Sequence, residues 1–486
     1  MEFFDCLFVG FPINGKPTFE KEEGLMELGF ESELNSLAEL FRERGARLYV
    51  VGGRVRNALL GLPVSDTDVT SALRPDEVMA LCAEAGIKTV PKGIAFGMVE
   101  LHIGSEKYEH TTFRSDSYSE GGAHRPTSVS FSDSPEEDAF RRDFTVNALY
   151  ADVLTGETID PTGGIADLER RLIRTTSPDP EVILRDDGLR LMRLCRFAAE
   201  LGFDIEENTY NSAKKCAPLL SDISGERVRD ELNKLLLADA KYGLPPEESV
   251  LRGLRLADGL GLIDVILPEL AKCRGVEQSP KFHRFPVLEH IFRTVAMAPP
   301  DIRLRLACLL HDAAKPVMLE RNGNMHGHDA EGETIAAEVL SRLRFDNATS
   351  EEVRWLVRHH MFDLDGRAKE TTLRKRFCRW GEERTLLLAD VREADFRGSV
   401  GEIIPVPSAE RWRRILRRMR EEGAPFSEDE LNCTGRDIME WLSLPPGPEI
   451  GEVKTALLLH CAAKPKDNTP GTLRKIAQEI AKNNFF

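Results

Sequence analysis

Two aspartates, Asp66 and Asp68, stand one residue apart in the segment VSDTDVTSA, whose alternating pattern predicts a strand. On a strand such residues share a face, with Cα atoms about 6.6 Å apart. Two carboxylates this close repel each other unless water or a cation separates them. Mg²⁺ is commonly held by a few carboxylates together with substrate phosphates, and two-metal sites place their ions ~3.5–4 Å apart. The pair therefore indicates either a Mg²⁺ site or two solvated acids.

A double glycine precedes these aspartates. Gly52 and Gly53 end a predicted strand, ARLYVVGG, and open a predicted helix, RVRNALLG, in which Arg56 follows one turn later. Without a Cβ, backbone N–H groups can approach a phosphate closely. A third carboxylate, Glu109, lies on another predicted strand, in YEHTTFR. Three carboxylates, a glycine turn and an arginine suit nucleotidyl transfer, in which metals activate a hydroxyl and stabilise departing pyrophosphate. The alternative is an ordinary turn with solvated acids.

The elements that must position these groups form a mixed α/β pattern up to about residue 160. Apolar residues at helical spacing and a closing glycine predict a helix over 31–45. The segment MVELHIGSEKYEHTTF predicts a hairpin with a Gly-Ser turn, whose second strand carries Glu109. After DPTGG the pattern is helical, with one long amphipathic helix predicted over 181–203 and another over 225–237. Breaks are expected near 241–250 and 403–410.

Composition sets the class of protein. At 486 residues the chain is long enough for three or four domains of about 150 residues. It lacks a signal peptide and any run of ~20 apolar residues, so no membrane partner is expected. Nine cysteines without a Cys-x-x-Cys pair predict free thiols and a cytoplasmic protein. A net charge of −16 argues against non-specific coating of nucleic acid. The arginine-rich stretches 373–380 and 411–420 are either a localised basic groove or solvated helix faces.

Four motifs occur in order: VGGRVRNALLGLPVSDTDVTSA, YEHTTFR, RRDFTVNAL and RDDGLRLMRLCRF. Together they resemble class II CCA-adding enzymes, the tRNA nucleotidyltransferases of the DNA polymerase β-like superfamily. The resemblance implies an α+β fold, in which a polymerase β-like nucleotidyltransferase head with a mixed β-sheet precedes an all-α neck, a helical HD domain and a helical tail. The implied domains are an N-terminal extension (1–30), the head (31–165), the neck (166–245), the HD domain (246–402) and the tail (403–486).

By that resemblance Asp66 and Asp68 bind catalytic Mg²⁺, and Glu109 orients or activates the tRNA 3′ hydroxyl. The residues that would contact the nucleotide triphosphate are Gly53, Arg56 and Arg142. Those that would brace the site are Gly52, Asp143 and Asn147. One position departs from the family, because relatives usually carry Asp where this chain has Asn57. Asparagine keeps a hydrogen-bonding oxygen but loses the charge.

Asp187 and Arg190, in RDDGLR, are three residues apart on the helix predicted over 181–203, where the simplest interpretation is an ordinary ion pair. Cytosine and adenine both present an amino group beside an unprotonated ring nitrogen. A carboxylate can accept from the first and a guanidinium can donate to the second. In the family the matching pair selects CTP and ATP. The further residues that the resemblance assigns to this pocket are Arg193 and Arg196, with Glu226, Arg227 and Glu231 supporting them.

A block rich in histidine resembles the HD superfamily of metal-dependent phosphohydrolases. The metal ligands that it implies are His290, His311, Asp312 and Asp395, with His328 and His360 as ligands of a second metal. Imidazole together with carboxylate suits Mn, Ni, Fe or Zn. Such a centre would act on cyclic or terminal phosphates. The alternative is a helical body that mainly supports tRNA.

The expected function is template-independent addition of C, C and A to the tRNA 3′ end from CTP and ATP, with pyrophosphate release. The segment 115–131, which is shortened in CC-only relatives, is complete and favours CCA or A addition. The tail is expected to contact the tRNA elbow. Alternatives are an A-adding enzyme and a bacterial poly(A) polymerase, although PKGIAFGMVELHIG lacks the Arg-Arg-Phe-like run usual in the latter. From another class, the chain could be an HD phosphohydrolase or tRNA-binding protein with a silent head.

Overall fold

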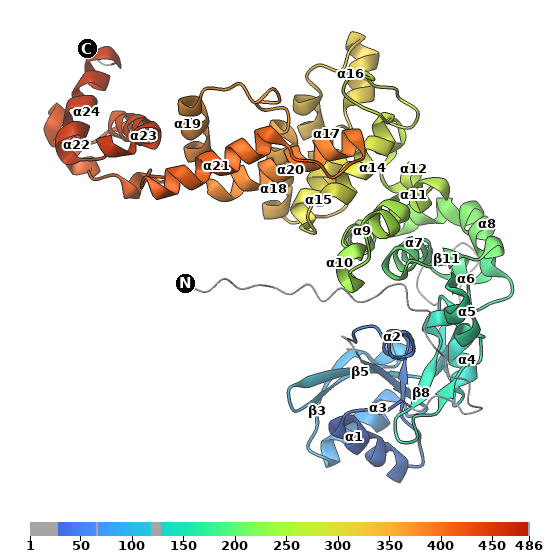
Figure 1. Cartoon of the computed structure of the whole chain (residues 1–486). Helices are drawn as coiled ribbons and strands as arrows, with labels where there is room; N and C mark the ends of the chain where they lie inside the picture. Colours follow the sequence, from blue (N-terminus) through green and yellow to red (C-terminus); the bar gives the residue numbers. More distant parts are fainter. Residues whose placement is uncertain (1–27, 65–66, 118–127, 485–486) are drawn as a thin grey trace. The chain divides into compact units, whose positions relative to one another are not determined.

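The computed structural model describes residues 28–64, 67–117 and 128–484 (Figure 1). These residues form two compact units. The first runs up to Arg190 and includes 203–216, and the second comprises 191–202 and everything from Ala217 onward. The fold is α+β, with a mixed sheet in the first unit and helices in the second, as the sequence predicts.

The first unit is built on a seven-stranded sheet with the order β3-β4-β5-β2-β1-β8-β9, in which only β2 and β5 pair in parallel. Its strands are β1 (Tyr49–Val51), β2 (Asp68–Ser71), β3 (Lys88–Gly93), β4 (Met98–Ile103), β5 (Glu106–Thr112), β8 (Tyr150–Asp152) and β9 (Thr158–Ile159). Two small pairs accompany it: β6 (Arg114–Ser117) with β7 (Ser128–Phe131), and β10 (Leu172–Ile173) with β11 (Asp204–Ile205). The hairpin predicted around Glu109 is confirmed as β4 and β5.

The helices of the first unit are α1 (Ser32–Glu43), α2 (Gly53–Leu60), α3 (Pro75–Glu84), α4 (Pro135–Phe140), α5 (Gly164–Arg170), α6 (Pro180–Asp186) and α8 (Glu207–Cys216). Helix α1 confirms the helix predicted over 31–45. Its apolar stripe is buried, and Phe41 contacts the ring of His110 on β5 at a centroid distance of 5.6 Å. Because side chains alternate along a strand, this contact leaves Glu109 on the other face of the sheet.

The second unit is helical (Figure 1). Its helices are α7 (Leu189–Leu201, beginning in the first unit), α9 (Gly225–Leu236), α10 (Ala238–Tyr242), α11 (Arg252–Gly259), α12 (Leu262–Ile266), α13 (Pro268–Ala271), α14 (Val287–Met297), α15 (Ile302–Leu310), α16 (Lys315–Asn322), α17 (His328–Arg342), α18 (Asn347–His359), α19 (Glu370–Trp380), α20 (Glu382–Val400), α21 (Pro407–Glu421), α22 (Gly435–Leu442), α23 (Pro448–Ala463) and α24 (Pro470–Asn484). Within the described ranges, none of the helices has the length and apolarity that crossing a membrane requires.

One prediction about the helices is wrong. The single helix expected over 181–203 is broken, because Asp187 is extended (φ −148°, ψ 106°) and its carboxylate accepts the Leu189 N–H at 3.1 Å. An aspartate at this position caps a new helix rather than continuing the old one. The break expected near 241–250 is present, because α10 ends at Tyr242 and the chain is not helical over 243–246. A π-helical turn, Glu247–Leu251, then leads directly into α11.

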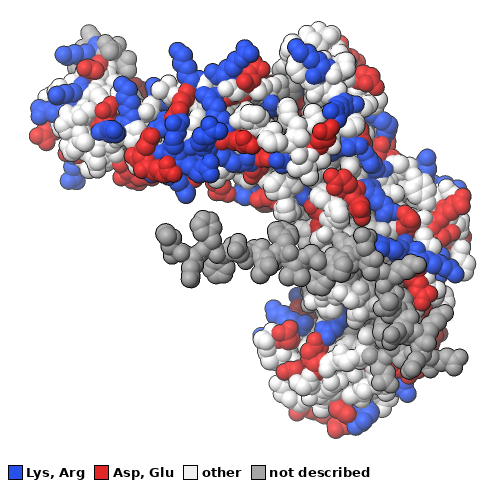
Figure 2. All heavy atoms as spheres, viewed as in Figure 1, with Lys and Arg blue, Asp and Glu red and all other residues white. Residues whose placement is uncertain are grey.

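The arginines of 411–420 lie on α21 and are largely committed to neighbours within the protein. Arg411 donates to the carbonyls of Gly366 and Ala368, and Arg413 pairs with Asp390 and Glu393. Arg418 and Arg420 pair with acids of α19 and α20. Over these helices Figure 2 shows Lys and Arg interleaved with Asp and Glu. The paired helix face, rather than a basic groove, is therefore the better interpretation of this stretch.

Candidate active site and metal centre

Strand register aligns the acids of the head in one row across the sheet. Asp68 on β2 pairs with Glu109 on β5 and with Val51 on β1, and Val51 in turn pairs with Tyr150 on β8. Directly paired residues project to the same face, and both acids are exposed there. Partial burial and the adjacent Asp68 carboxylate raise the pKa of Glu109. Asp66 lies outside the described residues, so its predicted place beside Asp68 stays a prediction.

The glycine turn follows Val51 and so adjoins this row. Gly52 has φ 74° and ψ −129°, a combination that only glycine adopts readily, and its N–H donates to the Leu149 carbonyl. Helix α2 begins at the next residue, Gly53, as predicted. Asn147 lies just behind the turn, since its carbonyl oxygen is 3.7 Å from where a Gly52 Cβ would stand. The Gly52 N–H is therefore used within the protein, whereas Gly53 is the first residue of α2, where an N–H has no acceptor within the helix.

Arg56 and Asn57 are buried behind the turn. The Arg56 guanidinium donates to the side-chain oxygens of Asn57, at 2.9 and 3.1 Å, and of Asn147, at 2.5 Å. Asn147 in turn donates to Asp143 at 3.2 Å, which fits the bracing role predicted for both residues. Arg56 is only 3% exposed, so this network fixes its position.

Asn57 uses both halves of its amide. Its oxygen accepts from Arg56, while its nitrogen donates to the Pro63 carbonyl at 2.7 Å. The backbone carbonyl of Asn57 accepts the Leu62 N–H at 2.8 Å. A carboxylate could make the first contact but not the second, because it has no hydrogen to donate. The amide thus ties α2 to the segment that leads into β2, which gives a physical reason for asparagine at this position.

The base-reading pair predicted from RDDGLR does not share one helix. Arg190, in the first turn of α7, is 9% exposed and donates to the carbonyls of Ile183 and Arg141, each at 2.7 Å. Asp186 lies 3.6 Å from its guanidinium. Asp187 caps α7 instead. The two side chains therefore belong to the same turn of the chain without the i, i+3 helical geometry that the sequence predicts.

The next two arginines on α7 meet an acid from α9. Arg196 binds Glu231 at 2.6 Å and Glu200 at 3.0 Å, and its guanidinium lies 3.9 Å from the Phe197 ring centroid. Arg193 is more exposed and lies 3.9 Å from Glu231. Burial alone would raise the pKa of Glu231, but the charges of Arg196 and Arg193 lower it. Of the other predicted supports on α9, Glu226 is exposed and Arg227 half-buried.

The structure brings the predicted histidines and acids of the HD block into one buried cluster. The Nε2 atoms of His290 and His311 are 3.1 Å apart, and each lies 3.2 Å from Asp312 Oδ2. Asp395 Oδ1 lies 3.2 Å from His290 Nε2. On the other side of the carboxylate, Asp312 Oδ1 is 3.2 Å from His328 Nε2. His360 completes that second group, with its Nε2 atom 3.1 Å from that of His328.

The donor set fits metal ions. The Nδ1 atoms of His311, His328 and His360 each lie 2.7–2.8 Å from a backbone carbonyl, which can only accept, so Nδ1 carries the hydrogen. In the neutral tautomer this aims the Nε2 lone pairs into the cluster, as metal ligation requires. Burial lowers the pKa of His360 to about 3, which keeps that ring neutral. Two ligand groups result, His290–His311–Asp312 and Asp312–His328–His360, and they share Asp312.

Close packing of α20 against α14 positions Asp395 at this centre. Gly398 on α20 faces Thr294 on α14 so tightly that a Cβ would stand 2.3 Å from the threonine Oγ1. Asp395 is one turn earlier on α20, and His290 is one turn earlier on α14. A side chain at position 398 would push the two helices apart.

The sequence interpretation missed several residues of these sites. Asp138 and Tyr150 bind Arg142 in the head, and Glu200 binds Arg196 on α7. Lys315, three residues after Asp312, lies 2.6 Å from Asp312 Oδ2. Asp138, Glu200 and Lys315 are three or four residues from their partners, a helical spacing that could have revealed them. Tyr150 is joined to Arg142 by a side-chain hydrogen bond across eight residues of sequence, a spacing that carried no such signal.

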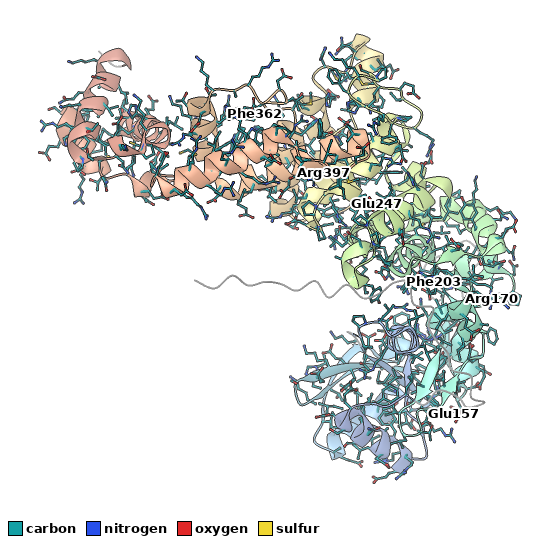
Figure 3. All side chains as sticks on the ribbon, in the orientation of Figure 1. Glu157, Arg170, Phe203, Glu247, Phe362 and Arg397 are labelled. Atoms are coloured by element: carbon teal, nitrogen blue, oxygen red, sulfur yellow. The ribbon has the colours of Figure 1, made fainter. Side chains whose placement is uncertain are left out.

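A cavity of about 290 Å³ lies elsewhere in the second unit, where Figure 3 labels Glu247 and Arg397 among its lining residues. Two ion pairs lie in its wall: Arg305 with Asp239, and Arg397 with Glu393. It contains no predicted site residue.

Known proteins resemble this chain in the same regions. Family models match a poly A polymerase head domain over 48–174, a probable RNA and SrmB-binding site of polymerase A over 202–273 and an HD domain over 287–396. An A-adding tRNA nucleotidyltransferase of Deinococcus radiodurans is 32% identical, over 89% of this chain and 95% of that protein. A CCA-adding enzyme of Geobacillus stearothermophilus is 33% identical, over 89% and 92%.

A solved structure gives the same result. The crystal structure of the Bacillus stearothermophilus CCA-adding enzyme in complex with CTP matches with a TM-score of 0.69 and 26% identity, covering 93% of this chain and 97% of that one. Sequence and structure agree over nearly the whole chain, and the head, RNA-binding and HD regions occur in the predicted order. The chain therefore belongs to the tRNA nucleotidyltransferase/poly(A) polymerase family.

Proposed function

We propose that this nucleotidyltransferase of the CCA-adding family adds C, C and A to the 3′ end of tRNA, using CTP and ATP. The row of Glu109 and Asp68, with the Gly52–Gly53 turn next to it, carries the proposal, because it places two acids on one face of the sheet close to the N-terminus of α2. The CCA-adding relative, which matches 89% of the chain, supports it.

Each group has a task in this reaction. Asp68, together with Asp66, would hold Mg²⁺, which when bound would supply charge stabilisation for the triphosphate and the departing pyrophosphate. Glu109, whose pKa is raised, is placed to accept a proton from the tRNA 3′ hydroxyl. The N-terminus of α2, at Gly53, would offer backbone N–H groups to the phosphates, and Arg142 would add positive charge beside it.

The experiment that tests the proposal offers the purified protein a tRNA that ends at the discriminator base, with Mg²⁺ and each nucleotide alone or in pairs. We expect three nucleotides to be added only when CTP and ATP are both present. Addition of a single A to tRNA that already ends in CC, with no use of CTP, would instead establish the activity of the Deinococcus radiodurans relative. A long A tail on any RNA would identify a poly(A) polymerase, and no incorporation would overturn the proposal.

Base selection gives a sharper prediction for the neck. Replacing Asp187 by alanine is expected to relax the preference for CTP over UTP by about tenfold or more, because an unpaired base edge costs 1–3 kcal/mol. Competition between CTP and UTP in single-nucleotide addition measures it. Glu181→Ala, which changes an acid of α6 that pairs with Arg185 and Lys215, is the control and should retain the preference. Equal discrimination in wild type and Asp187→Ala would contradict the base-reading role.

For the HD block we propose a centre that binds one or two transition-metal ions such as Mn, Ni, Fe or Zn. The observation that favours it is the shared Asp312, whose two oxygens face two separate pairs of imidazoles. When bound, such ions activate water for attack on phosphate esters. Phosphohydrolase activity on cyclic or terminal phosphates is the reaction that this centre would support, and the tail would contact the tRNA elbow.

A further inference from the structure

Asp138, on α4, is a buried carboxylate that joins several groups of the head. It is fully buried, and its Oδ1 accepts from the Arg114 N–H at 3.3 Å and from two Arg141 nitrogens at 2.7 and 2.9 Å. Its Oδ2 accepts from Arg142, through Nε at 3.1 Å and Nη2 at 3.0 Å, and from the Tyr150 hydroxyl at 2.7 Å. The Tyr150 oxygen also accepts from Arg142 Nε, at 2.9 Å.

This carboxylate is ionised when the protein works. Burial alone would raise the pKa of Asp138, but the charges of Arg142 and Arg141 and the Tyr150 hydrogen bond lower it to about 2. The hydrogen bonds to Arg142 are therefore charge-assisted, which makes them shorter and stronger than neutral ones. The guanidinium is held along its Nε–Nη2 edge, and its face lies 5.3 Å from the Tyr150 ring centroid.

The remaining nitrogen of Arg142 points to the glycine turn. Nη1 is 4.0 Å from the place that a Cβ on Gly52 would occupy. Tyr150 belongs to the same strand row as Asp68 and Glu109, through its pairing with Val51. Asp138 and Tyr150 therefore bind the Nε–Nη2 edge of the guanidinium, and Nη1 lies beside Gly52. A phosphate bound at the N-terminus of α2, at Gly53, would lie close to Nη1.

We propose that Asp138 and Tyr150 are positioning residues, which orient Arg142 toward the triphosphate of the incoming nucleotide. The inference rests on the proposed nucleotidyl transfer and adds two residues to it. Both act through Arg142, so they should influence affinity for the triphosphate and leave base choice unchanged. Preorganising a charged group in this way lowers the cost of ordering it when the ligand binds.

Tyr150→Phe tests this with the loss of one oxygen. We expect the KM for CTP and for ATP to rise on the order of tenfold, because a hydrogen bond to a charged group is worth about one tenfold step in affinity. The kcat and the inhibition constant of CMP, which lacks the outer phosphates, should change little. Tyr49→Phe is the matched control, because Tyr49 belongs to the same core cluster but its hydroxyl bonds Arg47.

An unchanged KM in Tyr150→Phe, or equal losses of CTP and CMP affinity, would overturn the positioning role. Asp138→Asn removes the charge and should raise the KM further, and rescue toward wild type by Asp138→Glu would support a carboxylate requirement. If Asp138→Asn does not fold, as thermal unfolding would show, Tyr150→Phe still decides. A wild-type protein that incorporates nothing would refute the proposed function, whereas an active wild type with an unaffected Tyr150→Phe refutes only the positioning.

Discussion

Asp68→Asn is expected to abolish nucleotide incorporation while leaving the head folded. The change keeps the shape of the side chain and removes the charge that would bind Mg²⁺. Asp68 is exposed at the end of β2, so its replacement disturbs no packing. Metal binding supplies several kcal/mol of charge stabilisation in the transition state, so the rate should fall on the order of 10³-fold. Single-turnover addition of CMP to tRNA, at saturating nucleotide, measures the change.

The control for this variant is Asp76→Asn, which alters an exposed aspartate on α3 of the same unit. Both variants should retain the circular dichroism and melting temperature of the wild type, and Asp76→Asn should retain its rate as well. If Asp68→Asn incorporated nucleotides at the wild-type rate, the row of acids on β2 and β5 would have no catalytic role, and the proposed function would lose its main support.

In the HD block, Asp312→Ala is expected to remove all bound transition metal. Asp312 faces both imidazole pairs, so its loss takes a ligand from each. Even groups that only support a ligand cost 10–100-fold in metal affinity, so loss of the ligand itself should cost at least about 100-fold. Elemental analysis of the purified variants, after dialysis against one ion at a time, measures the stoichiometry.

Two neighbouring histidines provide a ligand variant and its control for this experiment. His328 is buried in the second ligand group, and His326, two residues earlier, is exposed. His328→Ala should lower the stoichiometry by one ion, while His326→Ala should leave it unchanged. Full metal content in Asp312→Ala would show that the cluster is only a hydrogen-bonded core. Hydrolysis of a model phosphate ester by wild type, lost in Asp312→Ala, would add the phosphohydrolase activity.

The acids of the head were predictable because a strand is recognised from residues that are adjacent in the sequence. Alternating residues identified the strand of Asp68 and the hairpin of Glu109, and their register places the two side chains together. The histidine cluster was predicted from the family resemblance, and the helices assemble it as expected. In both cases a residue can be assigned to the site once the helix or strand that carries it is correctly predicted.

Other features depended on contacts between distant residues. Glu231 was expected only as a support of the pocket of Arg196, and its direct bond to that arginine, 35 residues away, is shown by the packing of α9 against α7. The helical pattern over 181–203 continues through Asp187 and Gly188, and only the carboxylate bonded to the Leu189 N–H shows where one helix ends. The role of Tyr150 followed from strand pairing with Val51, 99 residues earlier by their numbers. Periodicity carries no information on such pairings.

The amide of Asn57 also sets how this head responds to acidity. An asparagine has no titrating proton, so its bond to the Pro63 carbonyl persists at every pH at which the head is folded. An aspartate, which the family resemblance leads us to expect at this position, could donate to that carbonyl only when protonated, well below neutral pH. In this chain the attachment of α2 to the segment before β2 is therefore independent of pH.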